Sequence, residues 1–305
     1  MKVIYLKAQE SIFQLEPSVI AIGYFDGLHL GHMQLLHEVE QIAAATGLKK
    51  GFMTFDQHPQ VVFGKKDFQY LMSLQQKISL IENMGFDYFF IIEFNQSVAQ
   101  KQPLEFINSY LIKNRIEHVV CGFDFHFGDH GKGDSQTLTE LSQNRYQVKV
   151  VSKYEIDHQK VSSSLIRHYI HEGQISKANQ LLNRPYRITG KVMHGLKNGR
   201  RIGFPTANVD IGQYVVLKRG VYGAYVYIHQ KRYKAMANVG LNPTVGVLNT
   251  ISLEVHIFDF DEDIYGLSID VDFIEYTREE IQFKNLDELS SQLNSDKRYI
   301  DQLLD

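Results

Sequence analysis

Apolar residues recur along this chain in two different patterns, and the change from one to the other divides it into two parts. In the first part, apolar runs of strand length alternate with segments whose apolar residues recur every three or four positions. Such alternation is typical of parallel strands joined by crossover helices, so it predicts a doubly wound parallel α/β sheet. The predicted strands are 18–25, 51–55, 88–94, 118–121 and 148–151, and the predicted helices end at 47, run from 73 to 85, and span 103–113 and 135–144.

Start and stop residues support two of these helices. Gly47 and Gly85 follow the last apolar positions of their segments, where glycine commonly ends a helix. Ser73 followed by Gln76 has the spacing of a capping box at a helix start. In a sheet of this type, ligands bind beyond the carboxyl ends of the strands, so we expect the functional residues to follow the strands.

The second part of the chain begins after Ser162, where the pattern changes. A helical stretch over 163–182, broken by Gly173, leads into a series of segments rich in Val, Ile and Tyr with turn residues between them. Five or six such strands predict a small antiparallel β-barrel, and apolar residues at helical spacing over 286–304 predict one helix that caps it. We therefore predict two domains, 1–182 and 183–305. The predicted barrel strands are 188–194, 220–229, 233–239, 251–259 and 267–274.

Composition narrows the functional classes. The 305 residues include 32 Lys and Arg against 35 Asp and Glu, a net charge of −3, which lacks the basic excess of a nucleic-acid-binding domain. No apolar run approaches the roughly 18 residues of a membrane helix, and charge appears too early for a signal peptide. The single cysteine, Cys121, lies in an apolar stretch and is predicted to be a buried strand residue. We expect a cytoplasmic protein with no nucleic-acid or membrane partner, and its oligomeric state, a homo-oligomer included, stays open.

A segment rich in glycine and histidine, 23–32 (GYFDGLHLGH), falls where the strand over 18–25 gives way to a helix. A helix N-terminus after a parallel strand presents free N–H groups to an anion, and glycines let a phosphate approach the backbone. His29 and His32 are placed to face one triphosphate and to stabilise charge that develops during phosphoryl or nucleotidyl transfer. The alternative is two ordinary histidines near a helix cap, and the complete string argues against it.

This segment resembles the His-x-Gly-His signature of nucleotidyltransferases, and its fuller string is similar to that of the prokaryotic bifunctional riboflavin kinase/FAD synthetase family. Two later segments, 122–134 and 162–167, resemble further motifs of the same family. Taken alone, the serines of 162–167 indicate only a helix cap, and Asp124 only an Asx turn. The resemblance implies that the nucleotide-binding residues of this domain are Gly23, Phe25, Asp26, Gly31, Asp124, Ser164 and Arg167.

The chain departs from the family pattern at three positions. His126 stands where the family usually has Arg, and Ser164 where it usually has Thr. Ser164 keeps a hydroxyl and His126 keeps a donor whose charge depends on pH, so we expect altered affinity and retained function. Asn183 replaces a usual glycine, and because asparagine tolerates positive φ, the turn at this point is expected to form.

In the second part, residues 199–208 (GRRIGFPTAN) resemble the riboflavin kinase motif that ends in Pro-Thr-Ala-Asn. The chain has no Walker A string, so a kinase here must hold ATP in another way. The resemblance implies nucleotide contacts at Gly199 and Gly203, while the Thr206 hydroxyl and the Asn208 amide oxygen offer part of an oxygen shell for Mg²⁺. The alternative is a Gly/Pro turn that leads into a strand.

Glu254 shares one face of a predicted strand with His256, opposite apolar neighbours. Spacing alone favours an ordinary solvent-exposed face. The resemblance instead implies that Glu254 is the general base that deprotonates the substrate hydroxyl, and it places Arg278 on the flavin side of the site.

The resemblance covers nearly the whole chain with its motifs in matching order. It implies ATP-dependent phosphorylation of riboflavin to FMN in the barrel, then transfer of AMP from a second ATP to FMN in the α/β domain, giving FAD and pyrophosphate, with Mg²⁺ as cofactor. Two alternatives stay open: an FMN adenylyltransferase with a non-catalytic barrel, and a regulatory protein that binds flavin and nucleotide without turnover. The joint presence of Thr206, Asn208 and Glu254 favours the two-activity enzyme.

Overall fold

The structure is a computed structural model that describes residues 1–7, 15–65, 67–195, 199, 203–242 and 250–305. Residues 200–202 of the predicted kinase motif lie outside the described residues. Contacts divide the chain into two compact units, one of Met1–Phe68 and Met72–Ser162 and the other of Gln69–Leu71 and Ser163–Asp305. Each unit is described by itself.

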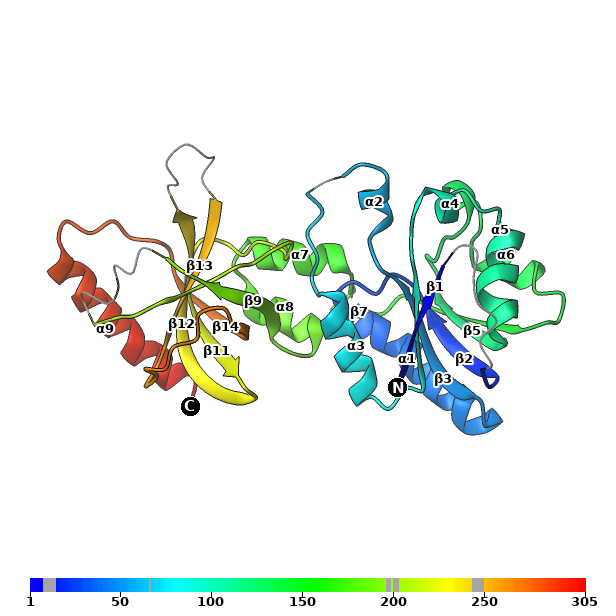
Figure 1. Ribbon diagram of the computed structural model, residues 1–305, viewed down its shortest axis with the longest axis horizontal. Helices are drawn as coiled ribbons and strands as arrows, with labels where there is room; N and C mark the ends of the chain where they lie inside the picture. The colour runs from blue at the N-terminus through cyan, green and yellow to red at the C-terminus, as the bar shows by residue number, and fades with distance from the viewer. Residues whose placement is uncertain (8–14, 66, 196–198, 200–202, 243–249) are drawn as a thin grey trace. The chain divides into compact units, whose positions relative to one another are not determined.

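The first unit is built on a parallel sheet, as predicted, and its six strands have the order β1-β4-β3-β2-β5-β6 (Figure 1). The edge strand β1 was not predicted. Its apolar pattern is weak because it buries only Ile4 and Leu6, while Val3 and Tyr5 are exposed. The strands are β1 (Lys2–Leu6), β2 (Ser18–Ile22), β3 (Lys49–Phe55), β4 (Tyr88–Ile92), β5 (Ile116–Gly122) and β6 (Gln147–Val151).

Helices cover both faces of this sheet, each over its own apolar core. One core lies under α1 (Leu30–Thr46) and α3 (Leu74–Asn83), and the other lies under α5 (Pro103–Phe106) and α6 (Ser135–Glu140) (Figure 1). The predicted stops and starts are confirmed, because Gly47 ends α1 at φ 76° and both hydrogen bonds of the capping box at Ser73 are present. The short elements are α2 (Pro59–Val62), α4 (Gln96–Ala99), η3 (Asp129–Gly131), and the hairpin of β7 (Glu155–Ile156) and β8 (Gln159–Lys160).

The helix predicted over 103–113 is only partly regular. After α5 the chain continues as the π-helical turn η1 (Ile107–Leu111) and the 3₁₀ turn η2 (Ile112–Asn114). The wider turn brings the side chains of Ile107, Tyr110 and Leu111 into the core together, which the apolar spacing alone could not distinguish from an α-helix.

In its described residues, the second unit is a closed six-stranded antiparallel barrel with three helices, which confirms the predicted barrel. Gly173 (φ 74°) separates α7 from α8, and Asn183 (φ 56°) ends α8 in the left-handed conformation expected of its replacement for glycine. The short strand β10 was not predicted because three residues carry no readable alternation. The elements are α7 (Ser163–His171), α8 (Ile175–Leu182), β9 (Tyr186–Met193), β10 (Ala207–Val209), β11 (Gly220–Ile228), β12 (Lys231–Asn242), β13 (Thr250–Ile257), β14 (Ser268–Arg278) and α9 (Leu286–Leu303).

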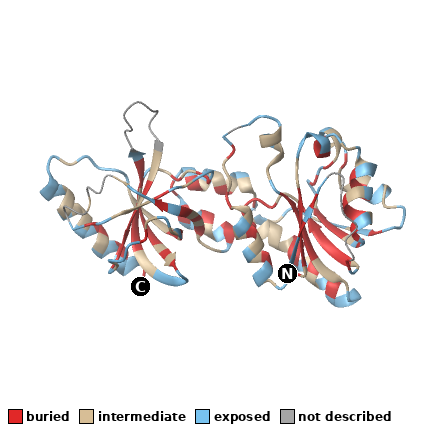
Figure 2. Cartoon of the chain, viewed as in Figure 1, coloured by how far each residue is buried: buried red, intermediate tan, exposed pale blue. Residues whose placement is uncertain are grey.

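Burial explains why the two parts of the sequence show different patterns (Figure 2). Strands β2 and β4 are buried at every position, whereas β9 alternates between buried and partly or fully exposed residues. A parallel sheet covered on both faces needs continuous apolar strands, and a barrel open to solvent outside needs alternating ones. Cys121 is fully buried on β5, as predicted, and burial raises the pKa of its thiol to about 11, which makes it unreactive at neutral pH.

In the part of the chain that the structure describes, no helix combines the length and apolarity needed to cross a membrane. The contacts assign α7 and α8 to the barrel unit, whereas the predicted boundary at 182/183 leaves them with the first domain.

Candidate active sites

The predicted nucleotide motif forms the turn between the carboxyl end of β2 and the first residue of α1. His29 is the N-cap of α1, and its Nδ1 accepts a hydrogen bond from the His32 backbone N–H at 3.3 Å. The two imidazole rings stack with centroids 3.6 Å apart. Because Nδ1 of His29 accepts, the neutral ring carries its proton on Nε2, which is therefore a donor. The helix start thus combines backbone N–H groups with two aligned histidines.

Glycines in this motif make room for the rings. A Cβ on Gly31 would lie 3.2 Å from the His29 ring, and a Cβ on Gly23 would lie 3.2 Å from the Phe25 ring. Phe25 itself is buried with a positive φ of 55°, and its ring packs edge-on against His32 with centroids 5.2 Å apart. The loop is therefore a tightly built backbone structure, in which Asp26 is also buried.

The second predicted motif follows β5, the strand that pairs with β2. Strand β2 lies between β3 and β5, and the chain leaves β2 toward β3, so the order of the strands reverses between β2 and β5. Ligands of such sheets bind at this reversal. Asp124 is exposed there and pairs with Lys160 at 2.7 Å, and His126 contacts the Asp124 carbonyl oxygen through Nδ1 at 3.1 Å.

The third motif lies at the start of α7, in the second unit. Ser164 is exposed on the first turn, and Arg167 donates through Nη2 to the Gln69 carbonyl oxygen at 3.2 Å. Within the first unit, the Val161 carbonyl oxygen, just before this motif, lies 3.6 Å from where a Cβ on Gly31 would stand. The chain that leads into 162–167 therefore passes beside the histidine motif.

The kinase residues come together on the wall of the barrel. Asn208 on β10 pairs in register with Glu254 on β13, and the Thr206 hydroxyl donates to Glu254 Oε2 at 3.3 Å. All three side chains are half-buried. Asn238 on β12 pairs with Glu254 on its other side, so three polar side chains form a row across three strands. Residues far apart in the sequence thus form one polar cluster.

Close backbone approaches shape this cluster. A Cβ on Gly199 would lie 2.1 Å from the Phe204 carbonyl oxygen, and a Cβ on Gly195 would lie 2.1 Å from Asn208 Nδ2. Gly203 has a φ of 81°, which disfavours any other residue. The buried His256 contacts the Pro205 carbonyl oxygen through Nδ1 at 2.8 Å, and burial lowers the pKa of its imidazole. Glycine is therefore needed where the Asn208 amide packs against the turn.

The oxygen-bearing side chains of this cluster suit a hard cation that also binds phosphate oxygens of the substrate. Among the described residues, no three His, Cys, Asp or Glu side chains are grouped to hold a metal ion by themselves. Thr206 and Asn208 supply a hydroxyl and an amide, and the Asn208 side chain is held in place over Gly195. Oxygen ligands of this kind fit Mg²⁺, which commonly keeps few protein ligands and takes the rest from phosphates and water.

Arg278, at the end of β14, is held by the closing helix. Its guanidinium makes a bidentate pair with Asp296 on α9, with Nη2 and Oδ2 2.6 Å apart, and both side chains are largely buried. Two residues further on, Glu280 Oε1 lies 2.7 Å from where a Cβ on Gly240 would stand, on the face of β12 that also carries Asn238. The segment after Arg278 therefore reaches the same face as Glu254.

Sequence reasoning missed two residues, Asn238, which pairs with Glu254, and Lys77, which donates to the Tyr24 carbonyl oxygen of the histidine motif. It also missed the contact of His256 with the Pro205 carbonyl. Asn238 is an amide within a strand of apolar alternation, and Lys77 occupies an apolar position of α3, three residues after Leu74 and four before Ile81. A charged residue at a core position of a helix was the signal available for Lys77.

Comparison with known proteins finds relatives for both parts of the chain. Residues 12–165 match the family model described as FAD synthetase, and residues 182–304 match the one described as riboflavin kinase. The bifunctional riboflavin kinase/FMN adenylyltransferase of Listeria monocytogenes is 37% identical over 92% of this chain and 90% of its own. The Bacillus subtilis protein of the same name is 37% identical over 98% of this chain and 96% of its own.

A solved structure has the same fold over the whole length. The crystal structure described as a macrolide-efflux protein from Streptococcus pneumoniae superposes with a TM-score of 0.89 and 31% identity, covering 97% of each chain. The two family matches define the class of protein: a nucleotidyltransferase joined to a kinase. The chain belongs to the family of bifunctional riboflavin kinases/FMN adenylyltransferases.

Proposed function

We propose that the chain carries out the two activities of its family at two separate centres. The barrel cluster phosphorylates riboflavin to FMN, and the helix start at His29 transfers AMP from ATP to FMN. The observation that carries this proposal is the convergence of Thr206, Asn208 and Glu254 on one face of the barrel, because a binding protein has no need of a carboxylate beside a magnesium-type donor pair.

At the barrel, we assign Glu254 as the general base. It accepts the proton of the terminal ribityl hydroxyl of riboflavin as that oxygen attacks the γ-phosphorus of ATP and ADP leaves. The Thr206 hydroxyl, 3.3 Å from Glu254, orients the carboxylate, and Gly199 and Gly203 let the nucleotide phosphates approach the backbone. Thr206 and Asn208 would hold Mg²⁺, which supplies charge neutralisation of the phosphate oxygens when bound.

At the α/β unit, a phosphate oxygen of FMN attacks the α-phosphorus of ATP, and the bond to pyrophosphate breaks. We assign His29 and His32 to stabilise the charge that develops on the triphosphate, helped by the N–H groups of α1. The proton on His29 Nε2, fixed by the contact at Nδ1, supports a donor role. Ser164 and Arg167 are assigned to the leaving pyrophosphate. The nucleotide is also assigned contacts with Gly23, Phe25, Asp26, Gly31 and Asp124.

Three further predictions belong to this proposal. The domain boundary is placed at 182/183, which agrees with the start of the riboflavin kinase match at 182. The guanidinium of Arg278 is paired with Asp296. We therefore assign Arg278 to the flavin side of the site because it anchors the segment that follows it. A cytoplasmic location stays a prediction.

Separate substitutions at the two centres test the proposal. His29→Asn is expected to abolish conversion of FMN to FAD and to spare phosphorylation of riboflavin, and Glu254→Gln is expected to do the reverse. If either folded variant loses both activities, the two reactions do not take place at separate centres. If His29→Asn keeps full FAD formation, adenylyl transfer is placed at the wrong site.

A further inference from the structure

A lysine that belongs to no recognised motif lies beside residues 23–29, the turn between β2 and α1, which is called the nucleotide loop below. Lys77, on the first half of α3, is 3% exposed, and its ammonium points at the turn between β2 and α1. Nζ donates to the Tyr24 carbonyl oxygen at 2.8 Å and lies 4.5 Å from the centroid of the Tyr24 ring. Burial of a lysine costs free energy unless its charge is compensated. The contacts with Tyr24 supply part of that compensation.

The Tyr24 carbonyl is held by two donors. Besides Lys77, the buried Thr54 hydroxyl on β3 donates to the same oxygen at 2.9 Å. Tyr24 directly precedes Phe25, whose φ of 55° is unfavourable for an aromatic residue, and Phe25 packs against His32. A carbonyl fixed from two sides determines the direction in which the chain enters this strained residue, and so the position of the ring that supports His32.

Lys77 also balances the charge of the loop. Asp26 is 4% exposed, and its attraction acts to raise the pKa of Lys77, while burial acts more strongly and lowers that pKa to about 8. The ammonium is thus mostly protonated at neutral pH, and the buried Asp26 carboxylate attracts it. Removal of the Lys77 charge would take away part of the compensation of the buried Asp26 carboxylate.

We propose that Lys77 is a positioning residue for adenylyl transfer, which fixes the Tyr24 carbonyl and compensates Asp26 so that the loop presents His29 and His32 to the triphosphate in the reactive geometry. This inference rests on the proposed function, because it takes the helix start at His29 as the site of the reaction. Lys77 acts through the loop and is assigned no contact with substrate.

The expected kinetic effect follows from this indirect role. Misplacement of catalytic groups by about 1 Å costs on the order of 100-fold in rate. Groups that act mainly on transition-state charge lower kcat and kcat/KM together and change KM little when they are misplaced. Loss of the Lys77 ammonium should therefore lower kcat for FAD formation by at least about tenfold, with KM for ATP within about threefold of its original value.

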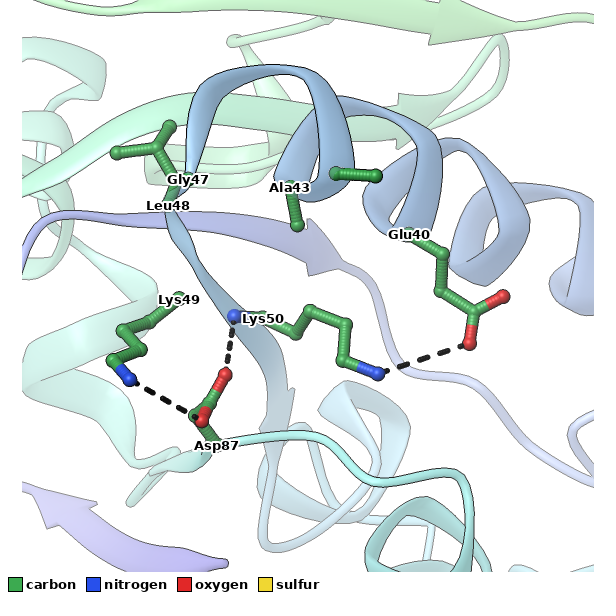
Figure 3. A pocket seen from close by; sticks show the side chains of 8 residues that line it. Glu40, Ala43, Gly47, Leu48, Lys49, Lys50 and Asp87 are labelled. Carbon is green, nitrogen blue, oxygen red and sulfur yellow. Dashed lines mark hydrogen bonds and ion pairs between the residues drawn. The ribbon is translucent and has the colours of Figure 1, made fainter.

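The first unit offers a matched control in Lys50 (Figure 3). This half-buried lysine also donates to a backbone carbonyl, that of Met84, at 3.3 Å, and its Nζ lies 5.3 Å from the centroid of the Phe86 ring and 3.9 Å from Glu40. It lines a surface hollow of about 420 Å³ beside Asp87, at the start of β3. That position is the end of the strand opposite to the nucleotide loop, so Lys50 tests the same chemistry away from the site.

The experiment measures steady-state FAD formation from FMN, ATP and Mg²⁺, and FMN formation from riboflavin, in four variants of the full chain. Lys77→Met removes charge and donor, Lys77→Arg keeps both, Lys50→Met is the matched control, and Thr54→Val removes the second donor to Tyr24. We expect Lys77→Met to lower kcat for FAD formation at least about tenfold, Lys77→Arg to restore it to within about threefold, and Thr54→Val to cause a smaller loss. Lys50→Met should leave it unchanged, and all four should keep FMN formation.

Three results would overturn the inference. They are a Lys77→Met kcat within twofold of the original, an equal loss in Lys50→Met, and a Lys77→Arg variant as impaired as Lys77→Met. If Lys77→Met does not fold, the comparison of Lys77→Arg and Thr54→Val decides, and an unchanged kcat in Thr54→Val then refutes the role of the Tyr24 carbonyl. His29→Asn, measured in parallel, separates this failure from that of the proposed function, since only a wrong site would leave His29→Asn active.

Discussion

Glu254→Gln tests the assignment of the general base most sharply. The substitution keeps the size of the side chain and an oxygen that accepts the Thr206 hydroxyl, whose contact is 3.3 Å long. Glu254 is half-buried, and its register neighbours Asn208 and Asn238 are uncharged amides. Removal of the Glu254 charge therefore breaks no ion pair with either of them. We therefore expect the free energy of unfolding to change by less than about 1 kcal/mol.

The loss of activity is expected to be much larger. A positioned general base contributes about 10²- to 10⁴-fold to the rate. From the middle of this range we expect a loss on the order of 10³-fold. This corresponds to about 4 kcal/mol of transition-state stabilisation, far more than the change in folding.

The assay is the rate of FMN formation from riboflavin and ATP, with FMN-to-FAD conversion measured in the same preparation. Glu275→Gln is the matched control, because Glu275 is also a strand carboxylate of the barrel that accepts a hydroxyl hydrogen bond, from Ser176 at 2.5 Å. It lies on β14, three strands away from β13 around the barrel. A Glu254→Gln variant that folds and keeps more than about a tenth of the rate refutes the base assignment, as does an equal loss in Glu275→Gln.

Three further predictions follow from the two sites. His29→Asn keeps an N-cap acceptor but loses the Nε2 donor, so FAD formation should fall at least about 100-fold with the helix content by circular dichroism unchanged. Gly199→Ala places a Cβ 2.1 Å from the Phe204 carbonyl oxygen, so it should lower FMN formation and the melting temperature while FAD formation persists. Burial lowers the pKa of Lys77 from 10.5 to about 8, and the attraction of Asp26 acts in the opposite direction. The other titratable groups on this side are Tyr24, whose ring centroid lies 4.5 Å from Nζ, and His58, whose ring packs edge-on against the Tyr24 ring. Below about pH 8 the buried charge therefore costs about 3 kcal/mol at about 1.4 kcal/mol for each pKa unit, and this cost disappears between about pH 8 and 10.5, because the unfolded chain binds the proton that the folded chain has lost. FAD formation should accordingly fall as the pH rises through about 8, and in Lys77→Arg this fall should move to higher pH. A pH profile identical in both proteins would contradict the role of the charge.

The fold could be predicted from the sequence where an element is long and its apolar period is regular. The buried strands of the sheet and the alternating strands of the barrel have such periods, and Gly47 and Ser73 marked helix ends by local chemistry. Strands β1 and β10 could not be predicted, because one has two exposed apolar residues at an edge and the other is three residues long. The π-helical turn after Phe106 depends on packing against the sheet, which periodicity does not report.

The candidate sites could be predicted where their residues are contiguous in the sequence, and could not where the fold brings distant residues together. The histidine motif and the Pro-Thr-Ala-Asn segment are contiguous, so the sequence alone identified them. The row of Asn208, Glu254 and Asn238 depends on strand register across the barrel, and only the structure supplies that register. Lys77 supports the nucleotide loop through a backbone carbonyl, an acceptor that every residue has, and no motif records such a contact.

The central claim is that one chain holds two working centres. Chromatography of the products formed by the purified protein with ATP and Mg²⁺, started in parallel from riboflavin and from FMN, tests it most directly. The account predicts that riboflavin gives both FMN and FAD, and that FMN gives FAD. FAD from FMN without any FMN from riboflavin would show that the barrel is not a kinase, and no product from either substrate would show that the two sites bind without turnover.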